Sequence, residues 1–152
     1  MTKNNFEEDL VRCIYASTAA KELQLADLKE LLVEARKKNA ELGVTGILLY
    51  ENGALFQVLE GTSSTIEQLY NTIKSDKRHQ RIIKLIYEPI EAREFANWSM
   101  GLATVSLDEL NEIEGLNDFF CRGKCFTDLD EGRVKKLLAA FKEGRWRNTI
   151  SG

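Results

Sequence analysis

Residues 43–61, G-V-T-G-I-L-L-Y-E-N-G-A-L-F-Q-V-L-E-G, form the stretch that decides the fold of this chain. Two apolar runs, 44–50 and 54–60, flank the dipeptide Asn52-Gly53. This dipeptide is the strongest short signal for a two-residue hairpin turn, since both turn positions need a positive φ. The stretch therefore predicts two antiparallel strands near the centre of a sheet.

Gln57 is a polar residue within the second of these strands. Because side chains alternate along a strand, Gln57 shares a face with Leu55 and Leu59, while Phe56 and Val58 share the other face. A buried amide without partners costs about 1–3 kcal/mol, so Gln57 should be hydrogen-bonded, through its donor end, its acceptor end or both. Neighbouring backbone groups could supply these bonds, which would make Gln57 purely structural.

Composition indicates one globular domain: 152 residues, 43% hydrophobic, 30% charged, formal net charge -3. The charge gives no general case for nucleic acid. With no apolar core for a signal peptide and no run of about 18 apolar residues, we expect a cytoplasmic protein without membrane contact. Three cysteines are more typical of reduced thiols than of disulfides. Cys121 and Cys125 with one distant histidine are a weak metal signal, so we expect no metal.

The remaining periodicity predicts strands at 10–16, 82–87 and 98–105, and helices at 25–38 and from 62–64 to Asp76. On the first strand, Val11, Cys13 and Tyr15 lie on one face, and Arg12, Ile14 and Ala16 on the other. The order β-α-β-β-α-β with one more strand is that of a ferredoxin-like α+β sandwich, with both helices on one sheet face.

Helix boundaries follow from capping signals. Lys37 and Lys38 suit the negative end of the first helix, and Gly43 can stop it. Asn39 would then stand at the helix end, where asparagine is also a common cap. Ser64 and Glu67 have the spacing of a capping box at the start of the second helix.

The sheet face opposite the helices needs a cover, since Ile14, Phe56 and Val58 lie on it. The C-terminal third carries a helical stripe: Val134, Leu137, Leu138 and Phe141. We therefore divide the chain into a core, 1–104, and a helical extension, 105–152, that caps the sheet. Ser106 and Glu109 have capping-box spacing at the start of that extension.

A basic cluster follows the second helix: Lys77, Arg78, His79 and Arg81, directly after Asp76. Such a run is usually a solvated loop. It can also bind phosphate, because arginine offers a forked set of donors.

In order along residues 9–104, the sequence resembles the BLUF family of blue-light sensors that use flavin. The matching motifs are C-I-Y-A-S at 13–17, Asn39, G-V-T-G-I-L-L-Y at 43–50, F-Q-V-L-E-G at 56–61, D-K-R-H at 76–79 and N-W-S-M-G at 97–101. No single motif is diagnostic, but the ordered set is specific.

The resemblance assigns roles by position. Tyr15 corresponds to the photoactive tyrosine, and Gln57 to the glutamine between that phenol and the flavin. Asn39 would bond the pyrimidine edge of the ring. Asp76, Arg78 and His79 would bind the cofactor as well, the two basic residues near its polar tail. The resemblance thus implies that residues 1–104 are a photosensory core that binds flavin, either FAD or FMN, with FAD expected.

The chemistry suits these residue types. A tyrosine can give up an electron and a proton, and a glutamine can relay the proton and change its orientation or tautomer, which rewires hydrogen bonds without breaking a covalent bond. Trp98 and Met100 correspond to the pair that passes the signal outward. Because they are two residues apart on one strand, they share a face, and a two-residue slide would exchange them. The alternative is that both are ordinary core residues on a terminal strand.

The expected function is a blue-light photoreceptor that is no enzyme and acts through light-dependent contact with another protein. Phe119, Phe120 and Trp146 suggest a homo-oligomer or a docking surface, although burial on the sheet would explain them as well. Two alternatives lack flavin: a colourless interaction module of the same fold and a small acyl-phosphate hydrolase. The hydrolase is disfavoured because no glycine-rich anion loop and no Ser-His-Asp set is found. A sensor that forms a cysteinyl adduct is disfavoured because no cysteine lies in a matching motif.

Overall fold

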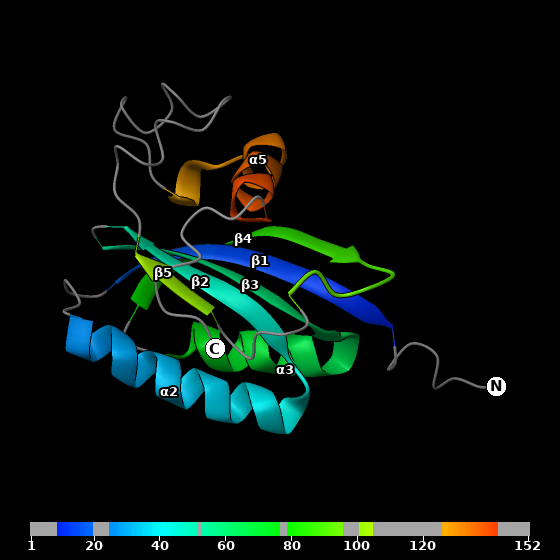
Figure 1. The fold of residues 1–152 in the computed structure, drawn as a ribbon, viewed down its shortest axis with the longest axis horizontal. Coiled ribbons are helices and arrows are strands. Elements are labelled where there is room, and N and C mark those ends of the chain that lie inside the picture. The colour runs from blue at the N-terminus through cyan, green and yellow to red at the C-terminus, as the bar shows by residue number, and fades with distance from the viewer. Residues whose placement is uncertain are drawn as a thin grey trace.

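The computed structural model describes residues 9–19, 25–51, 53–76, 79–95, 101–104 and 126–142. Its centre is a five-stranded sheet in the order β4-β1-β3-β2-β5 (Figure 1). The strands are β1 (Leu10–Ala19), β2 (Thr45–Glu51), β3 (Ala54–Thr62), β4 (His79–Pro89) and β5 (Gly101–Thr104). The pairs β1–β4, β1–β3 and β2–β3 are antiparallel, and β5 runs parallel to β2. This order confirms the predicted ferredoxin-like sheet.

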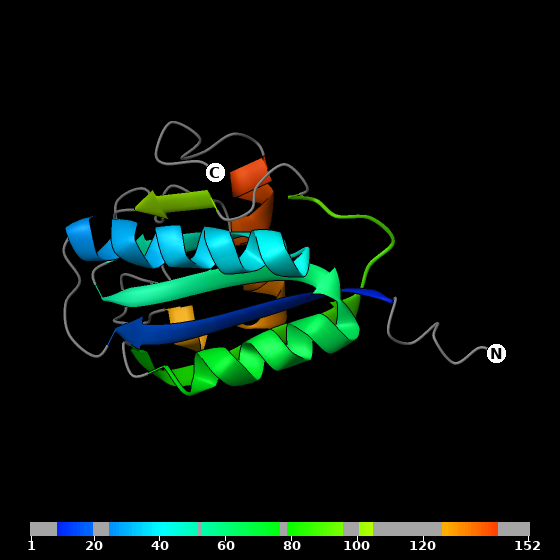
Figure 2. The same ribbon diagram turned by 90° about the horizontal axis from the view of Figure 1, so that it is seen from below.

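Helices cover both faces of the sheet. α2 (Leu25–Leu42) and α3 (Ser63–Lys74) lie side by side on one face, as Figures 1 and 2 show. The short helix η2 (Phe126–Asp128) and α5 (Glu131–Lys142) lie on the other. The predicted cover of the second face is thus present.

Two hydrophobic cores result, one on each face. Facing α2 and α3 are Val11, Cys13, Tyr15, Leu32, Val44, Leu48, Tyr50, Leu55, Leu59, Ile66, Leu69 and Tyr70. Facing η2 and α5 are residues that include Ile14, Phe56, Val58, Phe126, Val134, Leu137 and Leu138. The alternation predicted for β1 and β3 is therefore confirmed.

The hairpin has the predicted turn and the predicted strands. Glu51 pairs with Ala54, which leaves two residues in the turn, and Gly53 has a φ of 91°. A positive φ at this position is what a two-residue turn of this kind requires.

The end of α2 differs from the prediction. The helix continues to Leu42, so Asn39 lies inside its last turn, and Lys37 and Lys38 lie before that turn. Gly43 has a φ of 72°, and the N–H of Val44 donates to the carbonyl of Asn39 at 2.9 Å. This is the Schellman pattern, in which a left-handed glycine closes the helix and Asn39 needs no capping role.

The capping box predicted at Ser64 and Glu67 is wrong, because α3 starts at Ser63 and its cap is Thr62. The Thr62 side chain makes no cap bond to a backbone N–H. Its hydroxyl donates instead to the hydroxyl of Thr65 at 2.9 Å.

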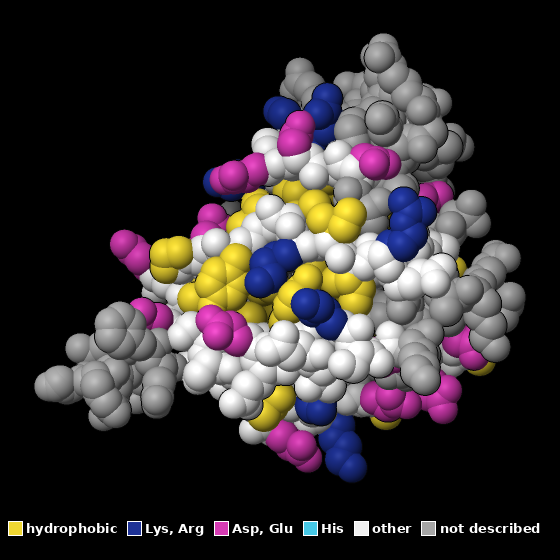
Figure 3. Space-filling view, turned by 180° about the vertical axis from the view of Figure 1, so that it is seen from behind, with side chains coloured by type: hydrophobic (Ala, Val, Ile, Leu, Met, Phe, Trp, Pro, Cys, Tyr) yellow, Lys and Arg dark blue, Asp and Glu magenta, His cyan; other side chains and the backbone are white. Residues whose placement is uncertain are grey.

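Strands β1 and β4 are longer than predicted, at 10 and 11 residues. β4 is the outer strand next to β1, and its Ile83 and Tyr87 side chains are exposed. The Lys84 ammonium lies 4.6 Å from the ring centroid of Tyr70 and 5.2 Å from that of Tyr87. Figure 3, seen from behind, shows basic side chains set within a hydrophobic area of the surface.

Several predictions fall outside the described residues: the capping box at Ser106 and Glu109, the cysteines Cys121 and Cys125, and the aromatic residues Phe119, Phe120 and Trp146. The division at residue 104 stays a prediction.

Candidate functional site

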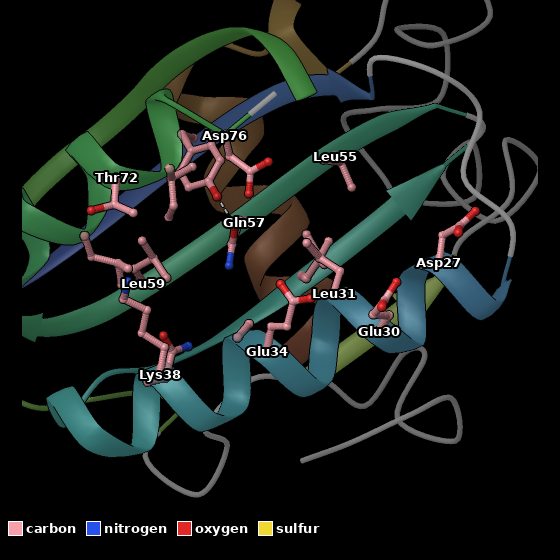
Figure 4. A pocket seen from close by; sticks show the side chains of 16 residues that line it. Asp27, Glu30, Leu31, Glu34, Lys38, Leu55, Gln57, Leu59, Thr72 and Asp76 are labelled. Atoms are coloured by element: carbon pink, nitrogen blue, oxygen red, sulfur yellow. Dashed lines mark hydrogen bonds between the residues drawn. The ribbon is translucent and has the colours of Figure 1, made fainter. Parts of the chain in front are cut away.

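A cavity of about 450 Å³ lies between α2 and α3, above the sheet (Figure 4). Its volume falls within the range of small-molecule sites. Its walls are mainly aliphatic, from Leu31, Ala35, Leu48, Leu55, Leu59, Leu69 and Ile73. Polar groups come from Tyr15, Asp27, Glu30, Glu34, Lys38, Asn39, Gln57, Thr72 and Asp76. The arrangement suits a flat ring with apolar faces and a polar edge.

Tyr15 and Gln57 form the polar floor of the cavity. They are direct cross-strand partners on β1 and β3, and the Tyr15 hydroxyl donates a hydrogen bond to Gln57 Oε1. Because the amide oxygen accepts from the phenol, the amide nitrogen is on the opposite side, toward the space between the helices (Figure 4). Gln57 can therefore connect Tyr15 with a ligand in the cavity.

Tyr15 is held in its neutral form. Its side chain is 2% exposed, and this burial raises the pKa of its hydroxyl well above the usual value. Negative charge at Cys13, Tyr70 or Asp76 would raise that pKa further. The phenol of Tyr15 is consequently a hydrogen-bond donor over the whole physiological pH range.

Asn39 and Asp76 add polar groups from the two helices. Asn39 is 2% exposed and lines the cavity from the last turn of α2. Asp76 follows α3 and lines the cavity from that side (Figure 4). An amide and a carboxylate can both bond the N–H groups and carbonyls on the edge of a heterocycle, or its hydroxyls.

Four predicted site residues thus meet in one cavity: Tyr15, Asn39, Gln57 and Asp76. The predicted residues Arg78, Trp98 and Met100 lie outside the described residues. His79 begins β4, where its backbone pairs with Ala19, and its side chain is likewise not described.

Four charged residues of α2 were missed by the sequence reasoning: Asp27, Glu30, Glu34 and Lys38. They flank the apolar Leu31 and Ala35 on the same helix face. Spacings of three and four residues place all six on one side of α2, so helical periodicity could have identified them.

Within the described ranges, no group of three or more His, Cys, Asp or Glu residues is arranged to hold a metal ion. None of the helices there combines the length and the hydropathy of a membrane span.

Comparisons with known proteins agree with this geometry. Residues 10–101 match the family described as BLUF, sensors of blue-light using FAD. The blue light- and temperature-regulated antirepressor BluF of Escherichia coli is 31% identical over 104 residues, 68% of this chain and 26% of BluF. The photoactivated adenylate cyclase subunit beta of Euglena longa is 32% identical over 126 residues, 82% of this chain and 14% of that subunit.

The dark-state structure of BlrB, a BLUF protein, superposes with a TM-score of 0.75. The two sequences are 32% identical, and the match covers 91% of this chain and 98% of BlrB. This chain spans about a quarter or less of the two curated relatives named above. The family match covers well over half of its residues, and the chain belongs to the BLUF family of blue-light sensors that use flavin.

Proposed function

We propose that this chain binds flavin non-covalently between α2 and α3 and reports blue light through Tyr15 and Gln57 to another protein. The observation that carries the proposal is the hydrogen bond from the buried Tyr15 hydroxyl to Gln57, whose amide also faces the cavity. Family membership supports it, because BLUF proteins are light sensors that use flavin.

The cavity fits the cofactor by its chemistry. Leucines from α2, β2, β3 and α3 can pack on both faces of a flat aromatic ring. Asn39 and Gln57 can bond the polar edge of such a ring. Asp76 would hold the cofactor too, and Arg78 and His79 would bind near its polar tail. We infer FAD as the resident flavin, with FMN as the alternative, since the isoalloxazine ring is common to both.

A bound flavin would supply absorption of blue light and an excited state that accepts an electron. The protein would supply the electron donor and the path for the proton. Burial disfavours the phenolate of Tyr15, so loss of an electron to the flavin would be accompanied by loss of the hydroxyl proton. The hydrogen bond would direct that proton to Gln57 Oε1. Rotation or tautomerisation of the amide would then exchange its donor and acceptor ends toward the cavity.

The output would be light-dependent binding of a separate protein, with no enzyme activity of this chain. Homologous sensors support an effector role: one is named an antirepressor and others are named adenylate cyclase subunits. Trp98 and Met100 would carry the change from the cavity to the surface, since in the sequence they come directly before β5, which pairs with β2. We also propose a homo-oligomer and a cytoplasmic location without contact to nucleic acid or membrane.

Absorption spectroscopy tests the proposal. The purified chain, reconstituted with FAD or FMN, is recorded in the dark and just after blue illumination. We expect a flavin spectrum that moves slightly to the red and recovers in darkness. Tyr15→Phe and Gln57→Leu should retain flavin and lose the shift, whereas Tyr50→Phe, in the same core but outside the cavity lining, should keep it.

A chain that takes up no flavin would overturn the proposal and favour a colourless interaction module. A full red shift in Tyr15→Phe would leave flavin binding intact and overturn the roles of the two residues.

A further inference from the structure

The segment between β4 and residue 96 is tied to the sheet by a buried carboxylate. Glu60, on β3, is fully buried. It accepts hydrogen bonds from the backbone N–H groups of Glu94, at 3.1 Å, and Phe95, at 3.0 Å. Arg12 compensates its charge, since Nε and NH2 of Arg12 donate to Glu60 Oε2 at 3.1 and 3.0 Å. Buried charges are stable only when paired and hydrogen-bonded in this way.

Arg93, in the same segment, connects three further elements. Its NH1 donates to the hydroxyl of Thr45 and to the backbone carbonyl of Glu60, each at 2.9 Å. Its NH2 donates to the carbonyl of Gly43 at 2.7 Å. The planar guanidinium thus spans the end of α2, the start of β2 and the last part of β3. A lysine could not reproduce this, because its donors radiate from a single atom.

These contacts join the two elements that bring amides to the cavity. Gly43 closes α2 through the cap in which the carbonyl of Asn39 accepts the N–H of Val44. Glu60 follows Gln57 by three residues on β3. The Arg93 side chain therefore bonds both to the end of α2, the helix that carries Asn39, and to β3, the strand that carries Gln57.

We propose that Arg93 is a positioning residue of the light sensor, one that fixes the end of α2 relative to β3 and thereby sets the rate of return to the dark state. The inference rests on the proposed function. In that function the Gln57 amide must reorient to recover, next to Asn39 in the same cavity. A rigid frame around the amide raises the barrier to reorientation, and loss of the Arg93 bonds lowers it.

Dark recovery of the flavin-loaded chain is the measurement. In Arg93→Ala and Arg93→Lys the red shift should keep its amplitude while recovery becomes about threefold or more faster, as expected for the loss of at least one net hydrogen bond from the frame. Arg133→Ala is the matched control, because Arg133 lies on α5 and pairs with Asp130. Its recovery should equal that of the unmodified chain.

Leu137→Ala separates this role from a general loss of stability. Leu137 is buried on the opposite sheet face, so the variant is destabilised without touching the Arg93 bonds. Its recovery rate should stay unchanged. A normal red shift with unchanged recovery in both Arg93 variants, or equal acceleration in Leu137→Ala, would overturn the role of Arg93. An unmodified chain without flavin or red shift would instead overturn the proposed function, and this inference with it.

Discussion

Burial controls the protonation of single residues beside the cavity. It raises the pKa of the Tyr15 hydroxyl well above its usual value and the pKa of the Cys13 thiol to about 11, although the charge of Lys84 opposes the latter shift. Cys13 and Tyr15 share one face of β1. Both therefore remain neutral at physiological pH, and the Tyr15 hydroxyl stays a hydrogen-bond donor throughout that range.

The raised pKa of Cys13 predicts a loss of stability in alkali. The unfolded chain releases this proton near the ordinary thiol pKa of 9.0, and the folded chain near 11. Between these values the unfolded state binds fewer protons, so the free energy of unfolding falls as pH rises, by on the order of 2–3 kcal/mol. Below pH 9 this thiol contributes no pH dependence.

Urea unfolding at pH 8 and pH 10.5 measures the effect. Cys13→Ala is the comparison because it lacks the thiol. This variant is less stable at pH 8, but its free energy of unfolding should fall less between pH 8 and pH 10.5 than that of the unmodified chain. Parallel declines would assign the alkaline loss to other groups, such as Tyr87, whose pKa is raised to about 12.

Asn39 is a second residue whose contribution can be measured. Its amide is buried in the cavity wall, so Asn39→Ala removes hydrogen-bonding groups from the ligand side. We expect flavin affinity to fall about tenfold, the equivalent of about 1.4 kcal/mol. Flavin titration followed by fluorescence quenching measures it. Asn71→Ala, an exposed position on α3, is the control and should bind normally; equal affinities of all three chains would exclude the Asn39 contact.

At the scale of elements, local sequence predicted the turn of the β2–β3 hairpin correctly but not the end of α2. The turn at Asn52-Gly53 was predictable because both residues favour positive φ. The end of α2 was misplaced by four residues, because Lys37, Lys38 and Asn39 are all compatible with a helix end. Gly43 decides it through its positive φ and the bond from Val44 to Asn39. Because this cap is made by backbone hydrogen bonds, the glycine is the only residue in the sequence that signals it.

Two glycines three residues apart in the sequence, Gly43 and Gly46, predict different losses of stability for the same substitution. At Gly43 an added Cβ meets nothing within 4 Å. The only loss of stability in Gly43→Ala therefore comes from the strain of a positive φ and is about 1–2 kcal/mol. At Gly46 on β2 an added Cβ would lie 1.8 Å from the carbonyl oxygen of Val58. The backbone cannot move away there without disrupting the β2–β3 pairing. Gly46→Ala should therefore lower the free energy of unfolding by more, about 3 kcal/mol or above.

Chemical denaturation of the two variants gives the comparison directly. Gly43→Asn serves as the control, because asparagine tolerates the left-handed region better than alanine. It should be more stable than Gly43→Ala. A Gly46→Ala chain as stable as Gly43→Ala would contradict the close approach of β2 and β3.

At the scale of the whole molecule, long-range pairing decides what the sequence could reveal. Alternation predicted the faces of β1 and β3, and hence that Tyr15 and Gln57 share a side of the sheet. Their direct pairing depends on strand register, which local pattern did not contain; the resemblance implied only that Gln57 lies between the Tyr15 phenol and the flavin. The ties from Glu60 and Arg93 join residues more than 30 positions apart, so no local pattern could have predicted them. The roles of Tyr15, Gln57, Asn39 and Asp76 stay predictions, as do those of Arg78, His79, Trp98 and Met100.

The position of α5 predicts that the C-terminal extension and the sensory core unfold together. Leu137 is fully buried in one core cluster with Phe56 and Val58, the neighbours of Gln57 on β3. Leu137→Ala should therefore lower the free energy of unfolding by about 3 kcal/mol and leave one transition. Circular dichroism of the helices and release of flavin should follow the same curve. Lys136→Ala, exposed on the same helix, should unfold like the original chain. If α5 were an independent unit, the variant would lose helix signal in a separate earlier step with flavin release unchanged; coincidence of both signals would mean that α5 and the sensory core form one cooperative unit.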